Sequence, residues 1–352
     1  MMATIIRSER PQEVHRPITL TRKRYLAVED TQLYDIRQQT ERLNLIPEIL
    51  NGLRREHKEL PSLLLWDSRG LGLFDVILDS TNYYPSKREP ELLQARVRKI
   101  ASTISSGDRV IELGAGNMRK TALILRTLEE QGKEIEYFAL DVARAALKAS
   151  LRELALLFPA PTKIKLRGLL GTYEDCASWL RWNESTTKTS LLWLGNSIAN
   201  FKPVEAAALL ANFFPSGRQT PTMIIGVDGC QDQSQIMKSY ENENSAKFVL
   251  NGLKHANNLL GAEVFRSSDW GFAARWNSRT MMHESFYIAE KDIILKIEGE
   301  TFHCRKGECV KAIMSGKWPL RKVSATCKKA GVQVLDSWMN EEQSYGMLVQ
   351  KL

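Results

Sequence analysis

From Asp108 onward, short apolar segments alternate with segments of helical spacing, and this alternation restricts the fold more than any other feature of the chain. Residues 109–113 and 135–141 are predicted to be buried strands, with a helix over 119–131 between them. Strands that alternate with helices are typical of a parallel sheet with crossover helices. Five more strands are expected over 162–167, 190–195, 222–228, 332–337 and 346–352. The sequence therefore predicts an α/β fold with a seven-stranded, Rossmann-like sheet.

The fifth and sixth predicted strands are separated by roughly 90 residues, too many for a simple loop. This insert has a helical stretch over 235–260 and alternating segments after it, and a second piece with helix signals precedes the sheet. We expect the two pieces to pack over the carboxyl edge of the sheet, where open α/β sheets bind ligands. The predicted division is a flexible tail over 1–25, a discontinuous α+β substrate-binding lobe over 26–87 and 231–316, and a Rossmann-like domain over 88–230 and 317–352.

Composition excludes general disorder and a membrane-spanning chain. Of the 352 residues, 43% are hydrophobic and 26% are charged, as in soluble globular proteins. No apolar run reaches the roughly 18 residues that a membrane helix needs. The N-terminal 20 residues lack the apolar core of a signal peptide, and the five cysteines contain no Cys-x-x-Cys pair. These features predict a cytoplasmic protein with reduced thiols and without a metal site.

The net charge of +8 is mild, because acidic and basic residues alternate along most of the chain. Such an excess can attract nucleic acid or anionic lipid, but mixed signs are also typical of an ordinary solvated surface. We therefore expect neither a nucleic-acid nor a membrane partner. A small-molecule substrate and a monomer or weak dimer are predicted instead.

The turn after the first predicted strand has the spacing E-x-G-x-G, from Glu112 through Gly114 to Gly116. Its glycines allow a ligand to approach the backbone closely, and the following helix presents free N–H groups. A dinucleotide fingerprint would have a third glycine where this chain has Arg119. Asp141, at the end of the second strand, suits an acceptor for ribose hydroxyls. Together these residues favour S-adenosylmethionine as the ligand over a ligand with a pyrophosphate. The alternative is that this turn binds no ligand and that its glycines serve packing alone.

Several longer motifs resemble the histidine-specific methyltransferase family. They include Trp66-Asp67-Ser68, Tyr83-Tyr-Pro-Ser-Lys-Arg-Glu89, Gly171-Thr-Tyr173 and Leu194-Gly-Asn-Ser-Ile-Ala-Asn-Phe201, and the resemblance extends from about Ile46 to Leu352. That family includes ergothioneine-pathway histidine N-methyltransferases and fungal dimethylallyltryptophan N-methyltransferases. The resemblance implies a class I methyltransferase fold that binds S-adenosylmethionine and releases S-adenosylhomocysteine.

The resemblance also implies which residues contact the cofactor. Lys120 would pair with the methionine carboxylate, Asp141 would accept from the ribose, and Tyr173 would lie beside adenine. Thr172 stands where bacterial histidine enzymes have an aspartate that holds the adenine amino group, so that contact stays open. The full expected cofactor set is Gly114, Gly116, Lys120, Asp141, Thr172, Tyr173, Gly195 and Ser197.

Tyr83, Asn200 and Tyr240 match family positions that hold the α-amino and α-carboxylate groups of the substrate, and we predict these three as the catalytic residues. An amide oxygen on Asn200 can accept from the amine, and phenols can donate to a carboxylate without placing a full charge beside the sulfonium. No strong general base is expected, and Tyr83, Tyr240 and water are the expected route for the amine proton. Either tyrosine alone would more commonly be a core or rim residue.

The side-chain pocket departs from the histidine enzymes of the family. They have a glutamate that holds the imidazole two residues before the serine equivalent to Ser315, whereas this chain has Ile313. An isoleucine would leave ring nitrogens unsatisfied, at about 1–3 kcal/mol each. Trp66 stands where the histidine enzymes often have tyrosine and adds apolar area to the pocket. Ser285 stands where they can have methionine and adds room. The alternative is that Ile313 is a core strand residue and the side chain is recognised elsewhere.

The sequence therefore predicts an S-adenosylmethionine-dependent α-N-methyltransferase for L-tryptophan or a prenylated tryptophan, as in indole alkaloid or betaine metabolism. Histidine N-methylation is the alternative within this class, and a catalytically silent S-adenosylmethionine-binding protein is the alternative outside it. A nucleic-acid methyltransferase is disfavoured, because such enzymes commonly have an Asn/Asp-Pro-Pro-aromatic loop where this chain has Asn200-Phe-Lys-Pro203.

Overall fold

The computed structural model describes residues 25–28, 31–38, 44–183, 187–214 and 220–351. The predicted tail over 1–25 lies outside these residues, apart from Tyr25. Among the described residues, no helix combines the length and the apolar character needed to cross a membrane.

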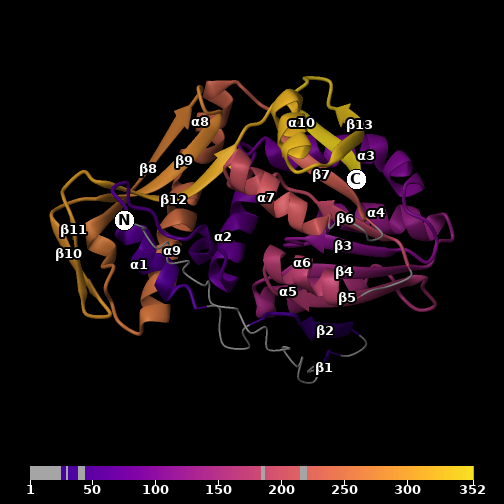
Figure 1. Cartoon of the computed structure of the whole chain (residues 1–352), viewed down its shortest axis with the longest axis horizontal. Coiled ribbons are helices and arrows are strands. Elements are labelled where there is room, and N and C mark those ends of the chain that lie inside the picture. Colours follow the sequence, from indigo (N-terminus) through magenta and orange to yellow (C-terminus); the bar gives the residue numbers. More distant parts are fainter. Residues whose placement is uncertain (1–24, 29–30, 39–43, 184–186, 215–219, 352) are drawn as a thin grey trace, which may run out of the picture.

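A nine-stranded mixed sheet forms the larger part of the molecule (Figure 1). Its strand order is β1-β2-β5-β4-β3-β6-β7-β14-β13. The five central strands are parallel, and they are β3 (Arg109–Leu113), β4 (Ile135–Asp141), β5 (Ile164–Leu170), β6 (Thr189–Trp193) and β7 (Thr222–Asp228). At one edge β14 (Tyr345–Lys351) and β13 (Gln333–Met339) continue the sheet in antiparallel pairs. These seven strands correspond to the seven predicted ones.

The two additional strands form a hairpin at the other edge. β1 (Tyr25–Val28) pairs with β2 (Thr31–Asp35), which lies parallel to β5. Leu33 of β2 is buried, and it packs where Gly168 of β5 has no side chain. The two strands of this hairpin were not predicted, and β2 belongs to the large sheet although its residues were predicted to lie in the lobe. Strands of 4 and 5 residues carry too few apolar positions to show a period.

Helices cover both faces of the sheet, which explains why its central strands are apolar along nearly their whole length. One core contains α3 (Pro85–Ser102), α4 (Arg119–Glu130) and α5 (Arg144–Ala155). The other contains α6 (Tyr173–Trp182), α7 (Pro203–Phe213) and α10 (Leu320–Lys329). Helix α3 was not predicted, because its residues are mostly polar and Pro90 lies within it.

The remaining elements form a lobe with a core of its own. Its sheet has the order β12-β9-β8, from β12 (Cys309–Gly316), β9 (Met282–Ala289) and β8 (Trp270–Asn277). A hairpin of β10 (Ile293–Ile297) and β11 (Glu300–Cys304) extends from it. The helical elements are α1 (Ile46–Leu53), η1 (Ser62–Leu65), α2 (Ser68–Leu78), α8 (Gln233–Tyr240), α9 (Glu243–Leu260) and the short η3 (Ser267–Asp269). Residues that precede β3 and residues of the insert between β7 and β13 thus share one apolar cluster.

The helical stretch predicted over 235–260 is two helices. Asn242 separates them, because its side chain caps α9 by accepting a hydrogen bond from the Ser245 backbone N–H.

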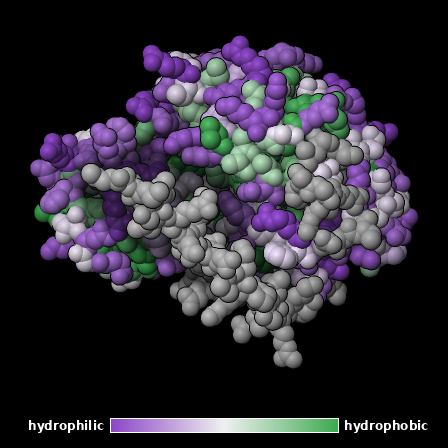
Figure 2. Space-filling view, viewed as in Figure 1, coloured by the Kyte–Doolittle hydropathy of each residue, from purple (hydrophilic) through white to green (hydrophobic). Residues whose placement is uncertain are grey.

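Two contacts bring the lobe to the carboxyl edge of the large sheet. Asn117, in the loop after β3, donates to Asp75 of α2 over 2.8 Å. The short helix η2 (Ser197–Asn200), which follows β6, lies against β12. Figure 2 shows hydrophilic residues over most of the coloured surface, with hydrophobic residues exposed in patches among them.

Candidate active site

The loop after β3 contains two glycines with left-handed backbone, and it is open beside Gly116. Gly114 has φ of +71°, and a Cβ there would lie 2.8 Å from the Tyr173 phenol oxygen. Gly116 has φ of +54°, and a Cβ there would meet nothing within 4 Å. Left-handed backbone is costly for residues with a Cβ, so glycine suits both positions. The loop therefore has the backbone conformation and the open side that a ligand at this edge requires.

Asp141 ends β4 directly beside this loop. Its carboxylate accepts from the backbone N–H groups of Gly116 over 3.2 Å, Val142 over 2.7 Å and Ala143 over 3.2 Å. Burial raises the pKa of Asp141, while these three N–H groups stabilise its charged form. The carboxylate is thus fixed in orientation and is suited to accept from a ribose.

Tyr173, at the start of α6, is held over Gly114 by an aromatic and hydroxyl cluster. Its hydroxyl donates to Ser197 Oγ over 3.3 Å, and Trp193 Nε1 donates to the same oxygen over 2.9 Å. The Tyr173 and Trp193 rings have centroids 4.9 Å apart. Burial raises the pKa of Tyr173 to about 12, so the phenol stays protonated at neutral pH.

Thr172 has a structural task in this cluster. It is the N-cap of α6, where its hydroxyl accepts from the Asp175 backbone N–H over 3.2 Å while Asp175 accepts from the Thr172 backbone N–H over 2.9 Å. This reciprocal pair is a capping box. The hydroxyl of Thr172 is therefore already engaged, and its cofactor contact remains only a prediction.

Lys120, the expected cation for the methionine carboxylate, is paired with Glu89 of α3. Its Nζ lies 2.5 Å from one Glu89 oxygen, and the Gly195 backbone N–H donates to the other over 2.7 Å. Glu89 is only 3% exposed, so this carboxylate ties the loop after β6 to the start of α4 from inside the protein. Sequence reasoning assigned no role to Glu89, although it ends the Tyr83–Glu89 motif.

The cofactor-side residues thus meet at the carboxyl ends of β3, β4, β5 and β6. These groups fit S-adenosylmethionine: they are a glycine loop with an open side, a fixed carboxylate beside it, and exposed backbone at Gly114 and Gly195. Among the described residues, no group of three or more His, Cys, Asp or Glu is placed to hold a metal ion.

On the lobe side, the predicted aromatic residues form a continuous cluster. Trp66 contacts Phe74 and Phe248 with ring centroids 5.1 Å away in each case. Tyr83 lies 6.1 Å from Phe74 and 5.4 Å from Tyr240 by ring centroids. The Tyr83 and Tyr240 hydroxyl oxygens are 3.3 Å apart, and either can be the donor. The structure therefore brings these two predicted tyrosines together and builds an apolar aromatic wall beside them.

The predicted side-chain pocket residues share one face of the lobe sheet. Ile313 of β12 lies opposite Ser285 of β9, and Ser315 lies opposite His283. Side chains alternate along a strand, so Glu284 faces the other way, where it pairs with Arg275 over 2.7 Å. A bulge between Lys311 and Ile313 sets this register.

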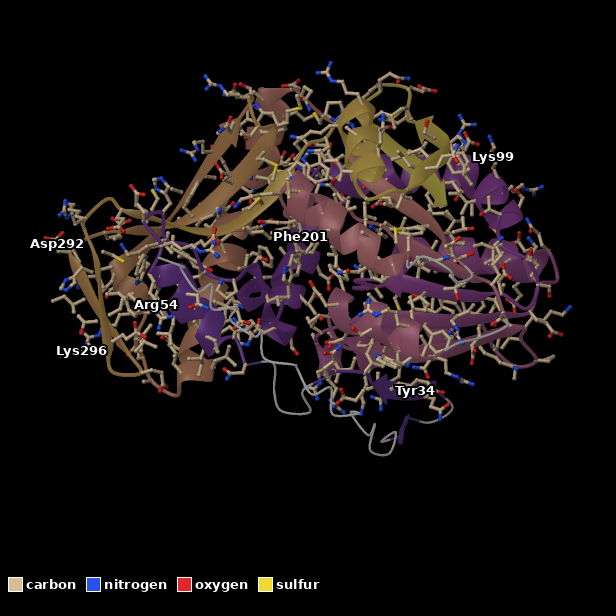
Figure 3. The ribbon with its side chains drawn as sticks, viewed as in Figure 1. Tyr34, Arg54, Lys99, Phe201, Asp292 and Lys296 are labelled. Atoms are coloured by element: carbon tan, nitrogen blue, oxygen red, sulfur yellow. The ribbon has the colours of Figure 1, made fainter. Side chains whose placement is uncertain are left out.

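Asn200 ends η2, close to the same strand. It is partly buried, and its side chain makes no hydrogen bond within the part of the chain that the structure describes. Figure 3 shows the following residue, Phe201, in the middle of the molecule, between the large sheet and the lobe. The carboxamide is therefore available to a ligand at this boundary.

A buried ion pair that the sequence analysis missed lies behind the tyrosines. Lys317 and Asp228 are both 0% exposed and are 2.9 Å apart. The Lys317 ammonium also donates to Tyr240 over 2.7 Å and to Ser315 over 3.1 Å. On the other side, Tyr84 donates to Asp228 over 2.6 Å. No sequence spacing links residues 228 and 317, although a carboxylate at the end of a parallel strand is a recognisable ligand-edge signal.

Asn196 joins the two halves of the site. It has φ of +61°, and its side chain donates to Ser315 Oγ over 3.4 Å and accepts from the Asp228 backbone N–H over 2.9 Å. The loop after β6 is therefore fastened to both β12 and β7, and this fixes the position of the neighbouring Gly195 and Ser197.

His283 is a further unpredicted residue at the site. Its ring packs 4.7 Å from that of Tyr240, and its Nε2 is buried without a hydrogen-bond partner among the described residues. Burial lowers the pKa of His283 to about 3, and the nearby Lys317 ammonium acts in the same direction. The imidazole is therefore neutral at physiological pH.

Comparison with known proteins agrees with this geometry. A sequence model of the family described as "Histidine-specific methyltransferase, SAM-dependent" matches residues 45–351. The chain is 52% identical to N-methyltransferase imqF of Aspergillus flavus, over 95% of this chain and 92% of that protein. It is 33% identical to ergothioneine biosynthesis protein 1 of Neurospora crassa, over 88% of this chain and 35% of that protein. It is 29% identical to 4-dimethylallyltryptophan N-methyltransferase easF of Aspergillus fumigatus, over 87% of this chain and 93% of that protein. The chain therefore belongs to the S-adenosylmethionine-dependent histidine-specific methyltransferase family, and it is an N-methyltransferase with a Rossmann-like fold.

Proposed function

We propose that this enzyme methylates the α-amino nitrogen of a free amino acid with a large aromatic side chain, tryptophan or a prenylated tryptophan being the leading candidates. The observation that carries the proposal is the composition of the side-chain face: Ile313 lies opposite Ser285, and the nearby Glu284 points away from them to Arg275. An imidazole would lack a carboxylate partner there, and buried unpaired ring nitrogens are unfavourable.

The aromatic cluster supports an indole over a small side chain. Phe74 is in edge contact with both Trp66 and Tyr83, and the three rings provide apolar surface for a bicyclic ring. The relative easF carries the name of a 4-dimethylallyltryptophan enzyme, in keeping with such a pocket.

The backbone end of the substrate is assigned to Asn200, Tyr83 and Tyr240. Bound S-adenosylmethionine supplies a methyl group on a sulfonium that is already activated, so the protein mainly aligns the amine with it. The Asn200 carboxamide oxygen accepts from the amine and aims its lone pair. Burial raises the pKa of Tyr83 and of Tyr240, so both phenols stay protonated. Their hydroxyls share one hydrogen bond, which leaves one phenol O–H to donate to the carboxylate. The residues at this position therefore orient the substrate, and the amine proton leaves through water beside the two phenols.

Histidine is the second candidate substrate. The family description and the 33% identity to an ergothioneine biosynthesis protein favour it. Ile313 disfavours it, for the reason given above.

Mass spectrometry of the purified protein with S-adenosylmethionine and a panel of tryptophan, 4-dimethylallyltryptophan, tyrosine and histidine tests the proposal. We expect a methylated tryptophan-type product, and a clear preference for histidine would contradict the pocket assignment. Asn200→Ala should abolish turnover and leave the S-adenosylhomocysteine affinity, measured by calorimetry, unchanged. Undiminished turnover in that variant would remove Asn200 from the site.

A further inference from the structure

We propose that Lys317, held by Asp228, is a positioning residue that makes Tyr240 and Ser315 hydrogen-bond donors toward the α-carboxylate of the substrate. This inference rests on the proposed function, since it assumes a substrate with a free carboxylate. It adds a role for a buried ion pair that does not itself touch the substrate.

The first observation is that all three N–H bonds of the Lys317 ammonium are directed. Its Nζ lies 2.7 Å from the Tyr240 hydroxyl, 3.1 Å from Ser315 Oγ and 2.9 Å from an Asp228 oxygen. An ammonium group has three donors and no acceptor. Each of the two hydroxyl oxygens must therefore accept from Lys317, and neither hydroxyl hydrogen can point back at it.

The second observation concerns the remaining partners of those hydroxyls. Ser315 Oγ also receives the Asn196 side-chain N–H over 3.4 Å, so both of its lone pairs are engaged and its hydrogen is left over. Tyr240 and Tyr83 share one hydrogen bond over 3.3 Å, and whichever of them donates it, one phenol hydrogen is left over. Ser315 also interacts with the Tyr240 hydroxyl, so the cluster keeps at least one O–H donor that none of its own members accepts and that is available to a carboxylate.

The third observation is the orientation of the ion pair. Asp228 is held by two further donors: Tyr84 donates over 2.6 Å to the carboxylate oxygen that also pairs with Lys317, and the Cys230 backbone N–H donates to the other oxygen over 2.9 Å. The pair is neutral as a whole, but its positive end faces Tyr240 and Ser315. A carboxylate that approaches those hydroxyls meets donors that are polarised by a cation 2.7–3.1 Å behind them.

A purely structural ion pair is the competing explanation. Buried pairs are costly to desolvate, and well-packed apolar residues often replace them without loss of stability. Such a pair would not distinguish a substrate carboxylate from a neutral group at the same position. The two explanations therefore differ in substrate discrimination and not in folding.

The test compares each amino acid that the wild-type enzyme methylates with its carboxamide, for example L-tryptophan with L-tryptophanamide. The variants are Lys317→Met, the double variant Lys317→Met with Asp228→Asn, and Tyr84→Phe. The double variant removes both charges and avoids an unpaired buried carboxylate, so it keeps the test available if Lys317→Met alone does not fold. S-adenosylhomocysteine affinity reports whether the folded cofactor site is intact.

We expect the wild-type enzyme to favour the free acid, and we expect the ratio of kcat/KM for acid over amide to fall by about 10-fold or more in the double variant, because hydrogen bonds to charged groups are the strong ones. Tyr84→Phe is the matched control: it removes a hydrogen bond from the same ion pair but leaves Lys317 and both hydroxyls, so its ratio should equal that of the wild type.

A double variant that binds S-adenosylhomocysteine normally and keeps the wild-type ratio would overturn the role of Lys317. A wild-type enzyme that methylates amide and acid equally well would also overturn it. If the wild-type enzyme methylates no free amino acid at all, the proposed function fails instead, so the two failures are distinguishable.

Discussion

Replacing Gly114 by alanine tests how the glycine loop and Tyr173 are coupled. Gly114 has φ of +71°, and an alanine in left-handed backbone costs about 1–2 kcal/mol. The new Cβ would also lie 2.8 Å from the Tyr173 phenol oxygen, a distance that forces the ring to move. Tyr173 would then lose its hydrogen bond to Ser197, a net loss of about 1 kcal/mol. We expect a total loss in the free energy of unfolding of about 2–3 kcal/mol.

Gly116→Ala is the matched control. Gly116 has φ of +54° and open space where a Cβ would be, so it incurs the backbone cost alone, about 1–2 kcal/mol. Urea unfolding of the ligand-free protein measures both variants. The excess loss in Gly114→Ala is the collision with Tyr173.

The Tyr173→Phe background separates the two terms. Without the hydroxyl, the next atom near the Cβ of an alanine at position 114 is a ring carbon at 3.7 Å, which is an ordinary contact. The effects of Gly114→Ala and Tyr173→Phe should therefore be non-additive by about 1 kcal/mol. Equal losses at positions 114 and 116, or additive effects in the double variant, would refute the packing of Tyr173 over the loop.

Three further predictions concern other residues of the site. Burial raises the pKa of Glu112 from its ordinary 4.5 to about 7, even with Tyr137 donating to it. Between these two pH values Glu112 is ionised in the unfolded chain but still protonated in the folded protein. The free energy of unfolding should therefore fall by about 3 kcal/mol as the pH rises from 4.5 to 7. Glu112→Gln should flatten this fall in urea titrations at pH 4.5 and pH 7.5, and an unchanged slope would contradict it. Thr172→Ala should lower the free energy of unfolding by about 1 kcal/mol through loss of the capping box, and it should change the S-adenosylhomocysteine affinity little. A large loss of affinity with normal stability would instead indicate that Thr172 contacts the cofactor. Ile313→Glu should shift the substrate preference toward histidine, with Ile313→Leu as the control, and no shift would mean that the imidazole position is mapped wrongly.

The sequence was informative wherever a residue's role depends on its neighbours along the chain. The alternation of apolar strands and helices predicted the parallel core of the sheet, and the E-x-G-x-G turn predicted an open loop at Gly116. Asp141 was expected at the end of a strand beside that loop, and it lies there. The hairpin of β1 and β2 could not be predicted in the same way, since each strand is too short to show a period and is stabilised by pairing with β5.

The polar contacts behind the site were decided by tertiary structure. Lys317 and Asp228 are far apart in the chain, and an ammonium or a carboxylate in a sequence gives no sign that it will be buried. The same is true of Glu89, whose partners Lys120 and Gly195 come from two other elements. Local sequence patterns predict the backbone conformation of a residue and the face of its helix or strand on which it lies, because both depend on adjacent residues. Which charges meet inside the protein depends on how whole elements pack, and only the folded arrangement determines it.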